Sequence, residues 1–263
     1  FQAIVGVDPN DPVTAAAKEH MPQDYMAALD ANGLRGARIG VLRQAYERDT
    51  TDPEIVSVFI RAVEDLRRAG AVIVDPATVE GLSDIRRAEG VGPCRGFKHD
   101  INAYLAGHGD RAPMKSLTEI VKSGRFHPTV RRQLEQTEAG PANGDDSPEC
   151  AADRDYRARV RAAVLKTMDE LKLDAFVYPT WSNVPRLIGD LNTPHGDNSQ
   201  FFSPVTGFPS VQVPMGYTRG DRLPAGMTFY GRAWSEATLI KLAYSYEQAT
   251  RHRRAPASTP PLR

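Results

Sequence analysis

The sequence is poor in the features that define several broad classes of protein. It has only two cysteines in 263 residues, Cys94 and Cys150, which is too few for a disulfide framework and matches no zinc-binding spacing. We therefore expect two free thiols in a reducing compartment. No apolar run approaches the length needed to cross a bilayer, and no signal peptide is visible. These absences predict a cytoplasmic protein without a membrane partner.

An excess of charge of either sign is also missing. Lys and Arg together number 33, as do Asp and Glu, so the formal net charge is zero. This balance gives no electrostatic reason to expect nucleic acid as a partner. The arginine-rich stretch 154–161 is interpreted as a solvated helix face. Since 41% of the residues are hydrophobic, a globular core and a small-molecule ligand are the better expectation.

The common catalytic motifs are absent as well. There is no G-x-S-x-G, no S-x-x-K, no phosphate-binding loop and no G-x-G-x-x-G. The six histidines are scattered, so we expect neither a metal nor a cofactor. Cys94, with Arg95 beside it and His99 nearby, allows a thiol nucleophile, but a small buried side chain at a helix start is the favoured interpretation.

What is present predicts an α/β fold with a mixed, largely parallel sheet flanked by helices. Residues 37–42 and 71–74 are expected strands, and between them Asp52 and Pro53 begin a helix that Gly70 ends. Strand, helix and strand in this order predict a βαβ unit. Residues 83–135 are expected to be mainly helical, and a long helix follows the loop at 140–148.

Further elements are expected nearer the C-terminus. Residues 174–178 form a buried strand, and 211–213 pairs with 227–230 as a hairpin. Ser235 is expected to cap the last helix. The chain begins at Phe1, on an apolar stretch rather than at Met, from which we expect that it is incomplete.

Six stretches of the chain resemble, in the same order, six stretches typical of amidase-signature enzymes. Each is weak alone, but their order makes chance a poor explanation. They are VDPNDP at 7–12, GLRGARIGVL at 33–42, LDAFVYPT at 173–180, SPVTGFPSVQVPMG at 203–216, LPAGMTFYGR at 223–232 and EATLIKLAYSYEQAT at 236–250.

The resemblance implies an amidase-signature fold and a serine hydrolase with a Ser-Ser-Lys triad. In that family the triad precedes the stretch that resembles residues 7–12, so it is expected before Phe1 and no catalytic residue is assigned here. Residues 1–263 are then the C-terminal part of a single amidase domain. Its regions are an arm (1–34), a βαβ and helical region (35–139), a loop (140–150), a sheet-completing and pocket-wall region (151–250) and a tail (251–263).

The part of the site expected in this chain is the far wall of the acyl pocket. Ligands bind near the carboxyl ends of strands in such sheets, and an apolar wall suits an aryl or aliphatic acyl group. The alternative for each aromatic residue is packing in the core. The expected substrate-binding residues are Thr180, Trp181, Phe201, Phe202 and Thr206.

Two functions remain open from the sequence. The first is hydrolysis of a carboxamide to a carboxylic acid and ammonia or an amine. It requires the N-terminal catalytic part, in the same protein or in a companion chain. The second is a non-catalytic α/β subunit or binding module derived from the same fold. A homodimer is left open, and transamidation with tRNA has no support in the sequence.

Overall fold

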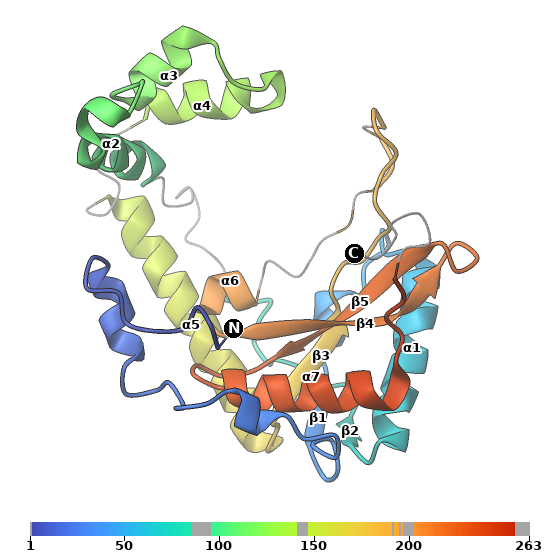
Figure 1. The fold of residues 1–263 in the computed structure, drawn as a ribbon. Helices are drawn as coiled ribbons and strands as arrows, with labels where there is room; N and C mark the ends of the chain where they lie inside the picture. The colour runs from blue at the N-terminus through green and yellow to red at the C-terminus, as the bar shows by residue number, and fades with distance from the viewer. Residues whose placement is uncertain are drawn as a thin grey trace, which may run out of the picture. The chain divides into compact units, whose positions relative to one another are not determined.

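The computed structural model describes residues 2–85, 96–140, 147–190, 192–194, 196 and 202–255. The chain divides into two compact units. One consists of Phe1–Glu80 with Arg161–Arg263, and the other of Gly81–Val160. The first unit holds the whole of the sheet that the structure describes, whose strands are coloured from blue through teal and yellow to orange in Figure 1. The cavities described below belong to this unit.

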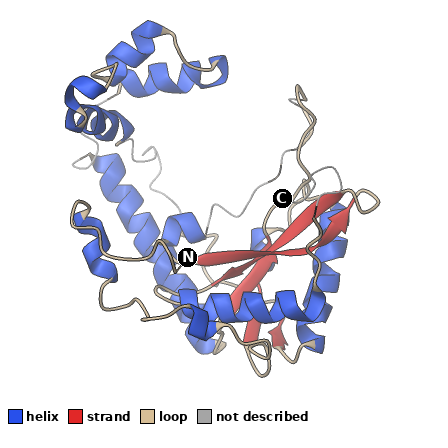
Figure 2. Cartoon of the chain, in the orientation of Figure 1, coloured by secondary structure: helices blue, strands red, loops and turns tan. Residues whose placement is uncertain are grey.

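The sheet, whose strands are red in Figure 2, has five strands. Their order is β2-β1-β3-β5-β4. β1 is parallel to both of its neighbours, β2 and β3, whereas β5 is antiparallel to β3 and to β4. The expected mixed α/β class is confirmed. The strands are β1 (Arg38–Val41), β2 (Val72–Val74), β3 (Ala175–Pro179), β4 (Ser210–Thr218) and β5 (Leu223–Tyr230).

The predicted βαβ unit is confirmed, with α1 (Pro53–Arg68) between β1 and β2. The Asp52 side chain accepts a hydrogen bond from the backbone N–H of Glu54 at 2.9 Å, and Pro53 occupies the first turn, where a missing N–H costs nothing. Gly70 has φ +97°, a conformation that favours glycine and lets the chain leave the helix.

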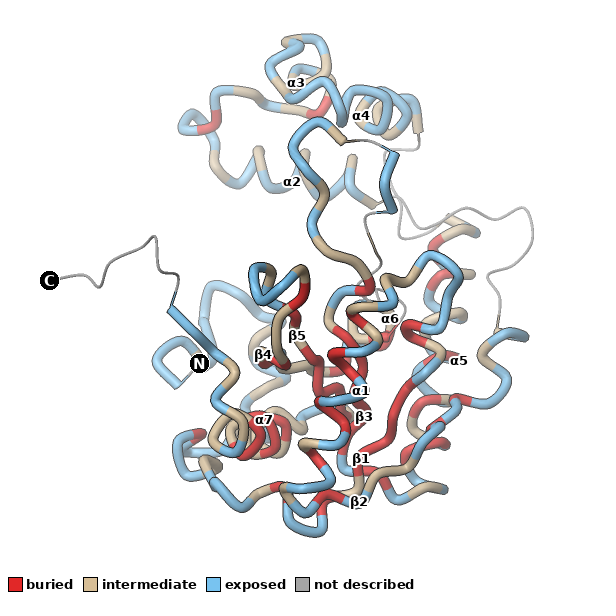
Figure 3. The backbone as a smooth tube through the Cα atoms, turned by 90° about the vertical axis from the view of Figure 1, so that its right-hand side faces the viewer, coloured by how far each residue is buried: buried red, intermediate tan, exposed pale blue. Residues whose placement is uncertain are grey.

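Alternation along the strands gives the sheet two different faces. On one face, Val177 and Phe229 lie in register, and the ring of Phe229 meets Tyr246 of α7 (Glu236–Thr250). Helices α1 and α7 both pack against the sheet. The opposite face carries a cluster of buried aromatic rings, made by Phe176, Tyr178, Phe202, Phe208 and Tyr230. The buried stretches of β3 and β5 are red in Figure 3.

Two details of the C-terminal elements differ from expectation. The hairpin is longer than predicted, since β4 continues through Pro214 and a register shift at Gly216. Pro is tolerated there because β4 is an edge strand. Ser235 does precede α7, but its hydroxyl donates to the carbonyl of Arg232 instead of accepting from the helix. The expected side-chain cap is therefore wrong.

The second unit is helical in its described residues, as predicted. It holds α2 (Phe97–Gly107), α3 (Leu117–Ser123), α4 (Arg131–Glu138) and the first part of α5 (Pro148–Glu170), with short 3₁₀ helices at Gly109–Arg111 and Pro128–Val130.

Cys150, at the start of α5, is buried and disulfide-bonded, so the expectation of two free thiols is wrong. Because disulfides are typical of oxidising compartments, the cytoplasmic prediction loses the support it took from free thiols. Cys94 lies outside the described residues.

The N-terminal arm, residues 1–34, is mainly irregular in its described part. It contains 3₁₀ helices at Pro12–Ala17 and Met26–Ala28, and a further one, Arg43–Ala45, follows β1. Leu34 anchors the arm: it is fully buried, and its N–H donates to the hydroxyl of Ser245 in α7 at 3.1 Å. Over the described parts of the chain, no helix is both long and apolar enough to span a bilayer.

Candidate substrate pocket

A cavity of about 690 Å³ lies where β3 ends, and we call it the β3 cavity. Its walls come from the loop after β3, from β4 and β5, and from the first turn of α1. Most of the wall is apolar, as is usual for sites that bind small molecules. The apolar lining includes Ile55, Trp181, Val184, Pro185, Pro214 and Pro224.

Most polar side chains of this wall form hydrogen bonds with nearby protein groups. Asn183 donates to the carbonyl of Thr50 at 2.9 Å, and Arg186 donates through Nε to the carbonyl of Thr193. Gln212 donates to the hydroxyl of Ser210 at 3.4 Å. These bonds fix the loop and the strand edge, so the cavity keeps an apolar character.

Thr180 is the polar residue that directly follows β3 and lines the cavity. Its N–H donates to the carbonyl of Gly226 at 2.7 Å, which extends the pairing of β3 with β5 by one residue. Its Oγ1 lies 2.9 Å from Oγ1 of Thr228, and Thr228 is only 2% exposed. The two hydroxyl groups therefore form a pair of which Thr180 faces the cavity.

The structure brings together two of the five residues predicted to bind substrate. Thr180 and Trp181 both line the β3 cavity, where the Trp181 side chain is 37% exposed. Phe202 is 1% exposed and packs against the rings of Tyr178 and Tyr230, so it lies in the core. Phe201 lies outside the described residues.

Thr206 is also buried, and its hydroxyl organises the turn after α6 (Ser203–Thr206). Its Oγ1 donates to the carbonyl of Phe202 at 2.7 Å, and it accepts from the N–H of Phe208 at 3.2 Å. Its Oγ1 also lies 2.7 Å from the Tyr230 hydroxyl, which must then be the donor. Burial raises the pKa of Tyr230, although this hydrogen bond opposes the rise.

Sequence reasoning missed the prolines and the glycine of the cavity wall. Pro214, Pro224 and Gly226 belong to two of the family-like stretches, but none of them was predicted to bind substrate. The pairing of β4 with β5 was predicted, but the pairing of β5 with β3, which brings Gly226 beside Thr180, was not. These residues could therefore not be placed together from the sequence.

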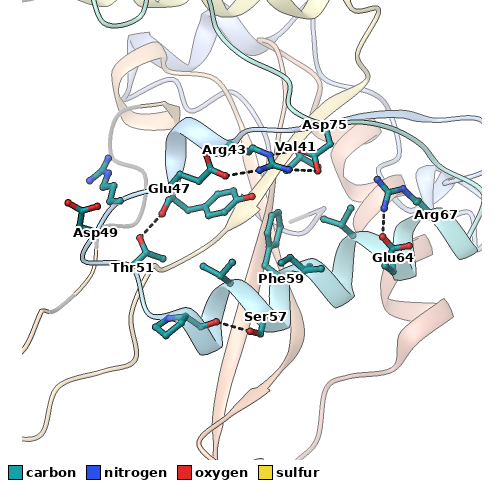
Figure 4. A pocket seen from close by; sticks show the side chains of 16 residues that line it. Val41, Arg43, Glu47, Asp49, Thr51, Ser57, Phe59, Glu64, Arg67 and Asp75 are labelled. Carbon is teal, nitrogen blue, oxygen red and sulfur yellow. Dashed lines mark hydrogen bonds and ion pairs between the residues drawn. The ribbon is translucent and has the colours of Figure 1, made fainter.

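A second cavity, of about 730 Å³, lies at the carboxyl ends of β1 and β2 (Figure 4). Arg43 lies between two carboxylates, with Nε 2.6 Å from Asp75 and Nη1 2.9 Å from Glu47. These hydrogen bonds raise the pKa of Arg43. Arg67 pairs with Glu64, and the Ser57 hydroxyl donates to the carbonyl of Pro53 at 2.8 Å. With Arg43 and Arg67 in ion pairs and the Ser57 hydroxyl bonded to the backbone, these described lining residues include no activated nucleophile.

Neither a metal centre nor a serine nucleophile is apparent in the ranges that the structure describes. They contain no group of three or more His, Cys, Asp or Glu that could hold a metal ion. Ser203, in one of the six family-like stretches, donates its hydroxyl hydrogen to the carbonyl of Phe208 at 2.7 Å. That hydroxyl closes the turn, so it is not poised to attack a carbonyl carbon.

Similarity to known proteins supports the family resemblance seen in the sequence. Residues 1–240 match the family model Amidase. A probable amidase of Arabidopsis thaliana is 28% identical over 266 residues, which cover 97% of this chain and 46% of the relative. A glutamyl-tRNA(Gln) amidotransferase subunit of Moorella thermoacetica is 27% identical over 265 residues, covering 97% of this chain and 53% of the relative.

Solved structures extend the likeness to the fold. The native peptide amidase of Stenotrophomonas maltophilia superposes with a TM-score of 0.69 and 33% identity, over 96% of this chain and 51% of that one. The chain thus spans about half the length of the relatives that it matches. On the family match and the shared fold, this chain belongs to the amidase family.

Proposed function

We propose that this chain forms the C-terminal part of a single amidase domain that hydrolyses carboxamides to a carboxylic acid and ammonia or an amine. The observation that carries the proposal is the apolar β3 cavity, which opens at the carboxyl end of a strand and is bounded by three family-like stretches. In this proposal the cavity receives the acyl group, and Thr180 and Trp181 are its substrate-binding residues.

The proposed chemistry is that of a Ser-Ser-Lys serine hydrolase whose triad lies outside this chain. Two findings support this division. The chain accounts for about half of each relative's length, and Ser203 uses its hydroxyl to hold a turn. Phe202 and Thr206 then pack the core and hold the turn after α6, instead of contacting substrate.

One relative favours a second arrangement, in which the chain works within a multi-subunit enzyme. That relative is named as one subunit of a glutamyl-tRNA(Gln) amidotransferase, which implies companion chains. In that arrangement the catalytic part lies in the same polypeptide or in a companion chain.

The test is a hydrolysis assay with the complete gene product on a panel of aryl and aliphatic carboxamides. We expect ammonia release, and we expect Trp181→Ala to raise KM for bulky acyl groups by about tenfold or more, because the indole supplies much of the apolar wall. Trp234→Ala is a matched control, since Trp234 stacks on His20, away from the cavity lining. Equal KM changes in both variants, or no ammonia from any amide, would refute the proposal.

A further inference from the structure

Burial decides which hydroxyl donates in the hydrogen bond between Thr180 and Thr228. Thr228 is 2% exposed, and among the described residues its hydroxyl has Thr180 as its hydrogen-bond partner. A buried donor left without an acceptor costs free energy. The Thr228 hydrogen therefore points to Thr180, and Thr180 accepts it.

It follows that the hydroxyl hydrogen of Thr180 is not used in the bond to Thr228. Only one hydrogen can lie between two hydroxyl oxygens, so the hydrogen of Thr180 is directed elsewhere, and this residue lines the β3 cavity. A hydroxyl group that accepts one hydrogen bond becomes a stronger donor in the next. The cavity thus contains a polarised donor in a mainly apolar wall.

Gly226 keeps this donor accessible. It lies across from Thr180 on β5, and a Cβ atom built on it would lie 3.0 Å from the Thr180 Oγ1. That separation is too short for comfortable packing, so any side chain here would crowd the hydroxyl group. The φ angle of Gly226 is not positive, so its backbone conformation is open to other residues. The contact with Thr180 is therefore what a side chain at this position would disturb.

We propose that Thr180 selects amides whose acyl group carries an oxygen acceptor, such as an ether or carbonyl oxygen, at the end that enters the β3 cavity. The inference rests on the proposed function and adds a substrate class to it. An acyl group without that acceptor would leave the Thr180 donor unpaired in an apolar surrounding. Sites built to hydrogen-bond a substrate discriminate strongly against analogues that lack the partner.

The test uses two amides of nearly equal shape, 3-(4-methoxyphenyl)propanamide and 3-(4-ethylphenyl)propanamide. The saturated spacer insulates the reacting carbonyl from the ring substituent. We expect the wild-type protein to prefer the methoxy compound roughly tenfold in kcat/KM, the effect of about one hydrogen bond. Thr180→Val should remove the preference, Thr180→Ser should keep it, and Gly226→Ala should reduce it by covering the hydroxyl.

Folding defects are separated by further variants. Thr180→Val strands the Thr228 hydroxyl, so Thr180→Val/Thr228→Val, which removes both hydroxyls, serves as the better-packed form and should also show no preference. Thr137→Val, on the surface of α4, should leave the ratio unchanged. An active protein whose ratio is the same with and without the Thr180 hydroxyl would overturn the inference and leave the amidase proposal standing.

If the wild-type protein hydrolyses neither amide nor any other in the panel, the proposed function itself fails. Calorimetry then tests the inference. It compares the dissociation constants of the two product acids, 3-(4-methoxyphenyl)propanoic acid and its ethyl analogue. Tighter binding of the methoxy acid, lost in Thr180→Val/Thr228→Val, would support a Thr180 donor site. Equal binding of both acids, or no binding, would overturn it.

Discussion

At the scale of single residues, the contact between Asp52 and Arg219 joins the start of α1 to the turn of the β4–β5 hairpin. Asp52 caps the helix and also pairs with the Arg219 guanidinium, which pairs with Glu54 as well. Burial raises the pKa of Asp52, but hydrogen bonds from Arg219 and from the helix N-terminus outweigh it and leave the pKa lowered.

This lowered pKa predicts a pH-dependent stability. A carboxyl whose folded pKa is depressed contributes fully above its unfolded pKa of about 4, and the contribution is lost as the pH falls through the folded pKa. Asp52→Asn, which can still cap the helix, should cost about 1 kcal/mol at pH 7, and the cost should shrink below pH 4. Urea unfolding at both pH values checks this, with Glu80→Gln as the control. A gap that does not change with pH would contradict it.

A second residue-scale prediction concerns the buried hydroxyl of Thr206. Thr206→Val removes the acceptor for both the Tyr230 hydroxyl and the Phe208 N–H, so it should cost about 1–3 kcal/mol. Tyr230→Phe should cost less, because Thr206 keeps its bonds to Phe202 and Phe208. Measuring the free energy of unfolding of both variants shows which one is destabilised more. A larger loss in Tyr230→Phe than in Thr206→Val would show that this hydrogen-bond assignment is wrong.

At the scale of elements, close packing of β1 predicts a strong effect from a small change. A Cβ atom on Gly40 would lie 2.6 Å from Leu173 Cδ1 and 2.7 Å from Ala77 Cβ. Gly40→Ala should therefore destabilise the protein by about 1–3 kcal/mol through overpacking. Gly107→Ala, at the end of α2 in open space, is the matched control and should cost nothing. Equal thermal shifts in the two variants would contradict the account.

The elements that the sequence predicts well are those whose signals are local. Asp52, Pro53 and the spacing of Ile55, Phe59 and Leu66 define α1 without tertiary help. The length of β4 could not be predicted, because Pro214 and Gly216 break a strand pattern that edge position tolerates. Similarly, nothing local distinguishes Phe202, which packs in the core, from Trp181, which lines a cavity: the difference arises from what the sheet places around them.

At the scale of the whole molecule, we propose that this chain provides the pocket for the acyl group and that the nucleophile lies outside residues 1–263. The most direct test is to label the complete, amide-hydrolysing gene product with a fluorophosphonate and to map the modified residue by mass spectrometry. The account predicts one modified serine outside residues 1–263, with labelling slowed by an amide substrate. A modified residue within these 263, such as Ser203 or Ser57, would contradict it.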